Sequence, residues 1–351
     1  MPGLRELSLL AALLVLVSVP AAAKKARVKD LIRDFEAGKL EDRLRLAPAL
    51  AHSKEKKAVD VLLNALDVKR GNPRETTALV EALGKAGDAR AVDSLVGAWD
   101  YLRSLMLQTE LPAHLQVLRW KILEALSLLG GDQAVSILSE SLNDKDPRVV
   151  EESVRGLGRL QVKEAVPALQ QLVGRGGDLT QAVFEAFGEI ADQRAVSTLE
   201  QALSNADKFV EIEAAYALAK LGKKEMFKRL EESLLNDPGT EKVGVLAAYY
   251  LAKLDRASGL EHLDRLSKRS DSGYAALAAE TLGKSGNPRA VVILVEAAKS
   301  GDSSLRLSSA RALGRLGGTR AVSALKKLHD DPHPGVRSAA ISALAELGEL
   351  D

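Results

Sequence analysis

The sequence predicts an all-α protein built as a stack of about nine to ten helix pairs. Three observations support this fold class: a ten-residue pattern returns at a nearly constant interval, leucine returns at fixed places around it, and the apolar residues follow helical spacing. Composition agrees, because a chain of 351 residues with only 3% aromatics suits helices that pack closely through small side chains.

The start of the chain differs from the rest. Arg5 precedes an apolar run over residues 7–19, and the letters PAAAKK follow. A basic start, a short apolar run and an Ala-x-Ala site are typical of a secretory signal peptide. We therefore expect residues 1–23 to be a signal peptide cleaved after Ala23, and the mature protein to be exported to the periplasm or outside the cell.

The alternative for this segment is a membrane anchor that is kept. The apolar run is short for a hydrocarbon core of about 30 Å, which takes roughly 20 apolar residues to cross. No later segment is long and apolar enough to span a membrane. We expect no stable membrane insertion after cleavage, with residues 24–39 as an N-terminal capping segment before the repeats.

The repeats are anchored on an Ala-Val pair, replaced by Met-Phe in one copy and Gly-Leu in another, that recurs every 30 to 33 residues with one interval of 43. Leucine stands four places after the anchor in all nine copies, and eight places before it in every copy but one, which has Phe187. A fixed period of this size indicates a repeat array. The anchors are Ala58, Ala91, Ala134, Ala165, Ala195, Met226, Gly259, Ala290 and Ala321.

Each copy is predicted to form a helix, a tight turn and a second helix. In the last full copy, two apolar stripes at helical spacing flank the pair Gly317-Gly318. Glycine at this corner suits the left-handed conformation that ends a helix. The residue that follows can cap the next helix, as at Asp88, Asn287 and Thr319.

Stacking explains why the pattern repeats. A helix pair of about 31 residues cannot bury its own apolar face, so neighbouring copies must bury it. The residue after the first leucine of each run is small in every copy, as in Gly283 and Gly314. We infer a close approach between helices there, because glycine otherwise costs about 1 kcal/mol of helix propensity relative to alanine.

The segments DPHPGVRSAAISALAELG (331–348) and AVPALQQLV (165–173) resemble HEAT repeats of the short bacterial type, named after phycobilisome lyases. The resemblance covers roughly residues 40–351. It implies a right-handed α-α superhelix, a HEAT/armadillo-like solenoid, with first helices on the convex side and second helices on the concave side. Such arrays are mostly binding scaffolds. The arginine that the family often has after valine matches Arg306 and Arg337, and Arg43 and Arg119 share the column.

Charge and composition exclude several classes of function. The net charge is +1, with 49 basic and 48 acidic residues, so nothing in the overall balance attracts nucleic acid. Residues 282–337 hold ten basic and four acidic residues, which we interpret as a solvated helical surface. The chain has no cysteine, so disulfides, zinc–thiolate sites and thiol nucleophiles are excluded.

Enzymatic activity remains the alternative to a scaffold, because some HEAT-like proteins are lyases or metal-dependent hydroxylases. The hydroxylases use His-Glu pairs, and none of the five histidines here precedes a glutamate. The run HDDPHP (329–334) offers two histidines and two carboxylates to a metal, but its prolines break helical ligand spacing. We expect no catalytic residue, no metal site and no cofactor.

The 43-residue interval marks an irregular unit. Its extra length lies between about Gly97 and Gln116. We expect a second helix extended by about two turns, a turn around residues 109–112 and a lengthened first helix in the next unit. Trp99, Tyr101 and Met106 are candidate partner-binding residues, since aromatic residues and methionine often anchor interfaces. The alternative is that these side chains pack between the longer helices.

Together these features predict an exported, non-catalytic protein–protein interaction scaffold built from HEAT-like repeats, with a protein partner in its concave groove. The alternative is a lyase-like or metal-dependent hydroxylase-like enzyme or enzyme subunit.

Overall fold

The computed structural model describes residues 21–235, 242–347 and 349. Within these residues the regular elements are α-helices α2 to α21 and two short 3-10 helices, with no strand. The predicted all-α repeat fold is confirmed. The predicted signal peptide lies outside the described residues except for its last three residues, which begin helix α2.

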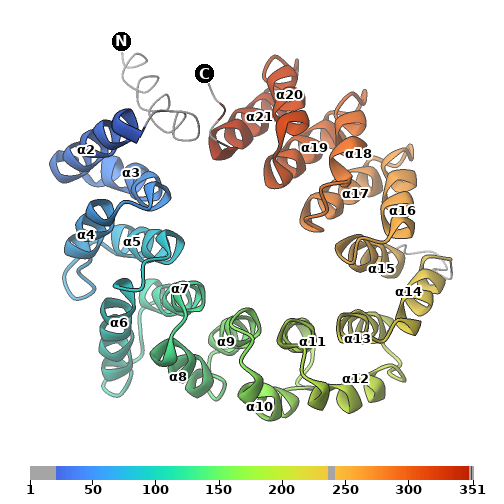
Figure 1. Cartoon of the computed structure of the whole chain (residues 1–351), viewed down its shortest axis with the longest axis horizontal. Coiled ribbons are helices and arrows are strands. Elements are labelled where there is room, and N and C mark those ends of the chain that lie inside the picture. Colours follow the sequence, from blue (N-terminus) through green and yellow to red (C-terminus); the bar gives the residue numbers. More distant parts are fainter. Residues whose placement is uncertain (1–20, 236–241, 348, 350–351) are drawn as a thin grey trace. The chain divides into compact units, whose positions relative to one another are not determined.

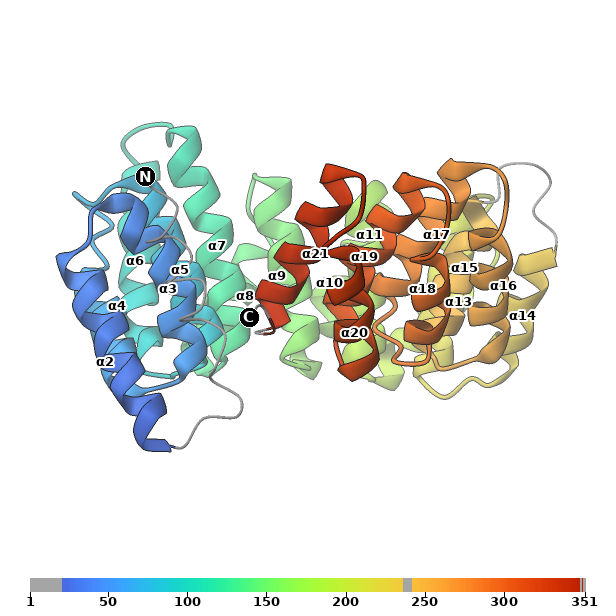
Figure 2. The same cartoon turned by 90° about the horizontal axis from the view of Figure 1, so that it is seen from above.

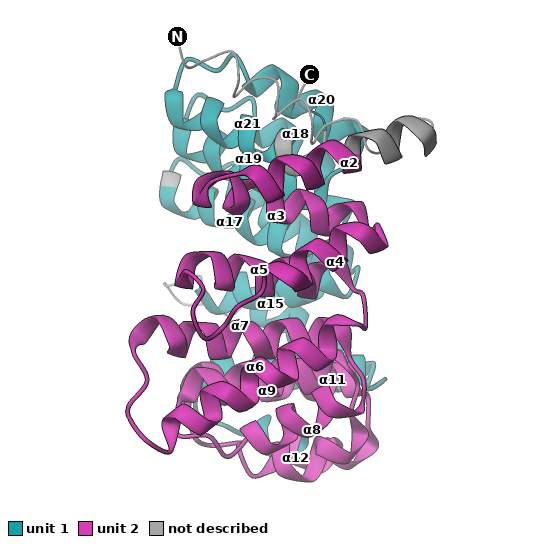
Figure 3. Cartoon of the chain, turned by 90° about the vertical axis from the view of Figure 1, so that its left-hand side faces the viewer, with its two compact units in different colours: residues 1–18, 200–351 teal, residues 19–199 magenta. Residues whose placement is uncertain are grey.

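The chain divides into two compact units, which Figure 3 shows in different colours. Unit 2 spans residues 19–199 and unit 1, in its described part, begins at residue 200. The helices that lie in unit 2 are α2 (Ala21–Ala37), α3 (Leu40–Ser53), α4 (Lys56–Ala65), α5 (Pro73–Ala86), α6 (Ala91–Met106), α7 (Ala113–Leu129), α8 (Asp132–Ser141), α9 (Pro147–Arg159), η1 (Lys163–Ala165), α10 (Val166–Gln170), α11 (Gly177–Ile190) and η2 (Gln193–Ala195).

Helix α12 (Val196–Ala202) spans the boundary in sequence between the two units. Unit 1 continues the alternation of first and second helices. Its helices are α13 (Lys208–Lys220), α14 (Glu225–Leu235), α15 (Lys242–Lys253), α16 (Ala257–Ser267), α17 (Ser272–Lys284), α18 (Ala290–Ala297), α19 (Ser303–Leu316), α20 (Thr319–Leu328) and α21 (Pro334–Leu347).

The backbone φ angle is positive at the corner between the helices of each pair. The five predicted corner glycines, Gly87, Gly130, Gly222, Gly286 and Gly317, all have positive φ. In the other four copies the same place, four residues before the anchor, holds Lys54, Gln161, Ala191 and Asp255. These four are also left-handed, with φ between 54° and 57°. The stacked helices therefore impose this conformation even where a side chain makes it unfavourable.

Side-chain caps fix where many helices begin. Asp88 and Asn287 were predicted to cap α6 and α18, but the N-cap residues of these helices are Arg90 and Arg289, without a side-chain cap hydrogen bond. Asp88 and Asn287 instead accept a hydrogen bond from the backbone N–H two residues later, in the turns that lead into the two helices. The same prediction is also wrong at Thr319, because that residue is already helical and Gly318 is the cap. Between pairs, the first helices are capped in the same way by Asn72, Asp146, Asp207, Asp271 and Asp302.

The first helices approach one another closely, as the small residues predicted. A Cβ added to Gly283 would lie 2.6 Å from Cβ of Ala312 on the next first helix, and one on Gly314 would lie 2.6 Å from Cβ of Ala343. These distances are too short for real side chains. Gly84 and Ala125 make the same approach in unit 2. In Figure 2, the first helices α17, α19 and α21 run side by side.

The layer of first helices and the layer of second helices lie on the opposite sides from those that the resemblance implied. The resemblance implied first helices on the convex side, but within each unit the first helices line the inner side of the curve and the second helices the outer side (Figure 1). The physical reason is the spacing of the layers: first helices that meet through glycine and alanine lie closer together, so the stack bends toward them.

The irregular unit has the predicted form. Helix α6 has 16 residues, against 10 in the second helices α4, α8 and α20. Residues 107–112 connect it to α7, which has 17 residues against 14 in α5. At the start of unit 2, the predicted capping segment falls in α2, which buries Val28, Leu31 and Phe35. No described helix combines the length and apolar character that crossing a bilayer requires.

Candidate functional site

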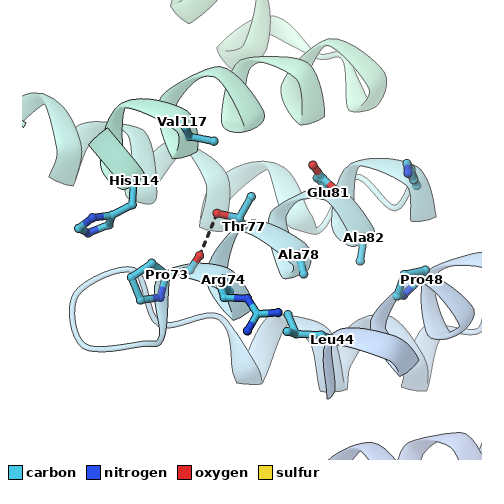
Figure 4. Close-up of a pocket in the computed structure, with 11 residues that line it drawn as sticks. Leu44, Pro48, Pro73, Arg74, Thr77, Ala78, Glu81, Ala82, His114 and Val117 are labelled. Atoms are coloured by element: carbon cyan, nitrogen blue, oxygen red, sulfur yellow. Dashed lines mark hydrogen bonds between the residues drawn. The ribbon is translucent and has the colours of Figure 1, made fainter. Parts of the chain in front are cut away.

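A groove of about 540 Å³ opens on the inner side of unit 2, over the first helices α3, α5 and α7. Figure 4 shows its walls: Leu44 and Pro48 of α3 lie on one side, and His114 and Val117 of α7 on the other. Helix α5 forms the floor. Its lining residues are Pro73, Arg74, Thr77, Ala78, Glu81, Ala82 and Lys85.

The groove exists because the exposed face of α5 is small. Thr77 and Ala78 lie at positions where most other first helices carry longer side chains, and Ala82 is buried beneath them. The hydroxyl of Thr77 donates a hydrogen bond of 2.9 Å to the carbonyl of Pro73, so its methyl group is left to line the groove. The result is a hollow of mainly apolar character beside solvent, a common feature of binding sites.

One wall contains a proline. Pro48 lies inside helix α3. Since proline has no N–H, it cannot donate the helical hydrogen bond to the carbonyl of Leu44, four residues earlier.

Ion pairs border the groove. Arg74 Nη1 lies 3.0 Å from Glu41 Oε1, between two largely exposed side chains. Glu81 Oε1 lies 2.7 Å from Lys121 Nζ, and Lys121 also reaches Glu124 at 3.0 Å. The hydrogen bond that Lys121 donates to Glu81 is the main cause that raises the pKa of Lys121, so this ammonium keeps its charge at neutral pH. The floor is thus apolar and the rim charged.

The sequence did not predict these groove residues. A weak pattern was present, since Thr77 and Ala78 occupy a helix face that is polar or large in most other copies. The pattern could not show that Leu44 and Val117, on two other helices, would leave a hollow above them.

Of the predicted partner-binding residues, Trp99 lies in the core. Its side chain is only 5% exposed, and the guanidinium of Arg119 lies 5.3 Å from the ring centre. Arg119 is itself buried and pairs with Asp144. The idea that Trp99 is exposed for a partner is therefore wrong: the lengthened α6 and α7 pack this ring between them, which was the stated alternative.

Tyr101 and Met106 are more accessible. Tyr101 is half-buried, with the ammonium of Lys69 5.5 Å from its ring centre. Met106 is 41% exposed at the end of α6, next to Leu107, which is 88% exposed. Both remain candidates for partner contact, separate from the groove over α5.

A second hollow lies beside the connection between α6 and α7, with a volume of about 930 Å³. Met106 lines it together with Trp120, whose indole N–H donates to Asp146 at 2.9 Å. Arg148 stacks on the Trp120 ring at 4.5 Å. These polar contacts hold the start of α9 against α7, so they have a structural role in the stack.

The HDDPHP turn is occupied by structural contacts. Asp331 is buried and receives two hydrogen bonds from Arg306, from Nε at 2.7 Å and from Nη2 at 3.0 Å. The Arg306 guanidinium holds the pKa of Asp331 below its usual range. Arg306 also donates to the carbonyls of Ser300 and Gly301, so it joins two successive turns. In the part of the chain that the structure describes, no three His, Asp or Glu side chains gather as metal ligands would.

Comparisons with known proteins agree with the fold. A family model described as HEAT repeats matches residues 107–183, 177–248 and 260–345, which together exceed half of the chain. No curated protein matches the sequence.

Solved structures of similar fold have low identity to the chain. One is human deoxyhypusine hydroxylase in complex with glycerol, at 21% identity over 72% of this chain and 97% of that one, with a TM-score of 0.37. Another is the complex of CpcE and CpcF of phycocyanin lyase from Nostoc, at 19% identity over 82% and 93%, with a TM-score of 0.36. An engineered protein matches at 21% identity over 97% and 98%, with a TM-score of 0.33. At these TM-scores, they carry no argument about this chain.

Proposed function

We propose that the chain, which belongs to the family of HEAT-repeat proteins, is an exported, non-catalytic scaffold that holds a protein partner. The observation that carries the proposal is the groove over α5, whose apolar floor and charged rim suit an apolar side chain of a partner.

The groove makes this proposal testable by single substitutions. Ala78 lies at its floor, half-buried, and a glutamate there would place a charge among apolar side chains. Ser94 is exposed on α6, on the outer side of the same unit, and provides a matched control.

We expect Ala78→Glu to reduce capture of a partner from the exported fraction of the native host at least about tenfold, because burying an unpaired carboxylate costs more than 1.4 kcal/mol. Ser94→Glu should capture the partner as the unchanged protein does. Affinity capture with mature protein, followed by mass spectrometry, measures this. Equal capture by both variants would contradict a binding role for the groove.

Export is a separate part of the proposal and rests on the leader-like segment at the start of the sequence. Protein purified from its native host should begin near Lys24, because a signal peptidase would cut after Ala23. Mass spectrometry of the intact chain measures this directly. A chain that still begins at Met1 or Pro2 would show that the segment is not removed.

The enzyme alternative is tested by elemental analysis of the purified protein. One or more equivalents of iron or zinc per chain would favour a hydroxylase-like activity over a scaffold.

A further inference from the structure

The first helices of unit 1 carry a local excess of positive charge. Helices α13, α15, α17, α19 and α21 together hold nine Lys or Arg and four Asp or Glu. The first helices of unit 2, which are α3, α5, α7, α9 and α11, hold nine Lys or Arg and ten Asp or Glu. Since the whole chain has a net charge of only +1, this excess belongs to one face of one unit.

Four of these cations form a row, which we call the basic row: Lys220, Lys253, Lys284 and Arg315. Each is exposed, lies in the last turn of its helix and stands two places after the column leucine. A cation at a helix C-terminus is favourable in itself. The helix C-terminus alone does not explain why all four positions are basic. The same position in unit 2 holds an apolar and an acidic residue as well, since the residues there are His52, Lys85, Leu128, Arg159 and Glu189.

Glu280 lies beside the basic row. Glu280 lies 2.8 Å from Lys284 Nζ, and it also lies near Arg311 and Arg315. The hydrogen bond from Lys284, followed by these neighbouring charges, lowers the pKa of Glu280. One carboxylate thus faces three cations. Lys253 lies over the rings of Tyr216 and Tyr249, at 5.3 and 5.6 Å.

A second row on the same face is apolar. Leu246, Leu277 and Leu307 are half-buried and pack on the core while keeping part of their surface in solvent. Each stands seven or eight residues before a member of the basic row. Two helical turns separate the rows, which is roughly 11 Å at 1.5 Å per residue. The basic row has one member on each of α13, α15, α17 and α19. The apolar row has one member on each of α15, α17 and α19.

The spacing along the rows fits one kind of chain. Neighbouring packed helices lie about 8–10 Å apart. A polyproline II segment rises about 3.1 Å per residue with three residues per turn, so every third side chain points the same way about 9.3 Å further on. We propose that the inner face of unit 1 binds an acidic polypeptide segment in this conformation, with a carboxylate at every third residue against the basic row and apolar side chains against Leu246, Leu277 and Leu307.

The observations favour a peptide over a nucleic acid. Phosphates follow one another at about 3.4 Å per strand along a duplex, so a row with one cation every 8–10 Å or about that would leave most of them without a partner. A nucleic acid also has no aliphatic side chains that could pack against the row of leucines. The proposal rests on the proposed scaffold role and names the chemistry of a partner segment.

The test uses the full mature chain and a fluorescein-labelled peptide of twelve residues with glutamate at every third position and proline, alanine or leucine between. A control peptide has the same composition with its glutamates in one block. We expect anisotropy titration at 50 mM NaCl to show binding that weakens as salt rises, because exposed ion pairs are screened. The control peptide should bind at least about tenfold more weakly, since its charges cannot meet four successive helices.

Charge reversal locates the site. We expect Lys220→Glu combined with Arg315→Glu to weaken binding at least about tenfold, because two attractions become repulsions. Arg320→Glu combined with Lys327→Glu changes the charge equally on the exposed outer helix α20 and should change binding less than about twofold. Circular dichroism checks that both variants stay helical.

Other results would overturn the proposal: no peptide binding, equal binding of both peptides, equal loss in both variants, or tighter binding of a single-stranded oligonucleotide than of the peptide. The Ala78→Glu variant separates this proposal from the groove proposal. In Ala78→Glu, peptide binding should be unchanged while partner capture falls. Lost peptide binding in this variant would count against the basic row, and intact partner capture in this variant would count against the groove.

Discussion

Replacing Trp99 with alanine should lower the free energy of unfolding by about 3–5 kcal/mol, because the change leaves a cavity where a buried indole stood. The ring is nearly inaccessible and has the buried guanidinium of Arg119 against it. Arg119 would lose this contact while remaining paired with Asp144. Urea unfolding followed by circular dichroism measures the change.

Trp120→Ala is the matched control for this prediction. Trp120 is only half-buried, and the substitution removes a single indole hydrogen bond to Asp146 and part of the packing. We expect a loss of about 1–2 kcal/mol. A Trp99→Ala protein within about 0.5 kcal/mol of the unchanged chain would show that the ring is a surface residue after all.

Leu294→Ala should destabilise the protein by about 2–5 kcal/mol, because the leucine is fully buried and its neighbours on two helix layers cannot collapse into the space. Leu294 represents the column four places after the anchor, and Leu199 in unit 2 should respond in the same way. Thermal and urea unfolding of each variant measure the effect.

Leu107→Ala removes the same atoms at an exposed position on the connection between α6 and α7. It should stay within about 0.5 kcal/mol of the unchanged protein. If Leu199→Ala and Leu294→Ala unfolded at the same urea concentration as Leu107→Ala, the leucine column would not be a core column.

The repeat could be predicted from the sequence because each column is sampled nine times. Leucines, corner glycines and small contact residues are local choices that stacking imposes again in every copy. The corners at Lys54, Gln161, Ala191 and Asp255 could not be predicted, because these residue types do not favour a left-handed backbone. Their conformation follows from the helices on either side.

Features that depend on several helices could not be predicted from the sequence. Trp99 suits an interface as well as a core, and only the position of Arg119 on the next helix decides between them. The groove depends on what α3 and α7 leave open above the small face of α5. The side toward which a unit bends depends on which layer of helices is more closely spaced. That spacing is set by contacts between copies, which the sequence of one copy does not show.

The central claim, that the inner side of unit 2 holds a protein partner, is tested most directly by photo-crosslinking. A photoreactive amino acid at position 78 in the groove and another at position 94 on α6 report which side the partner touches. The account predicts a discrete adduct with an exported protein from position 78 and none from position 94. An adduct from position 94 alone, or equal adducts from both, would contradict it.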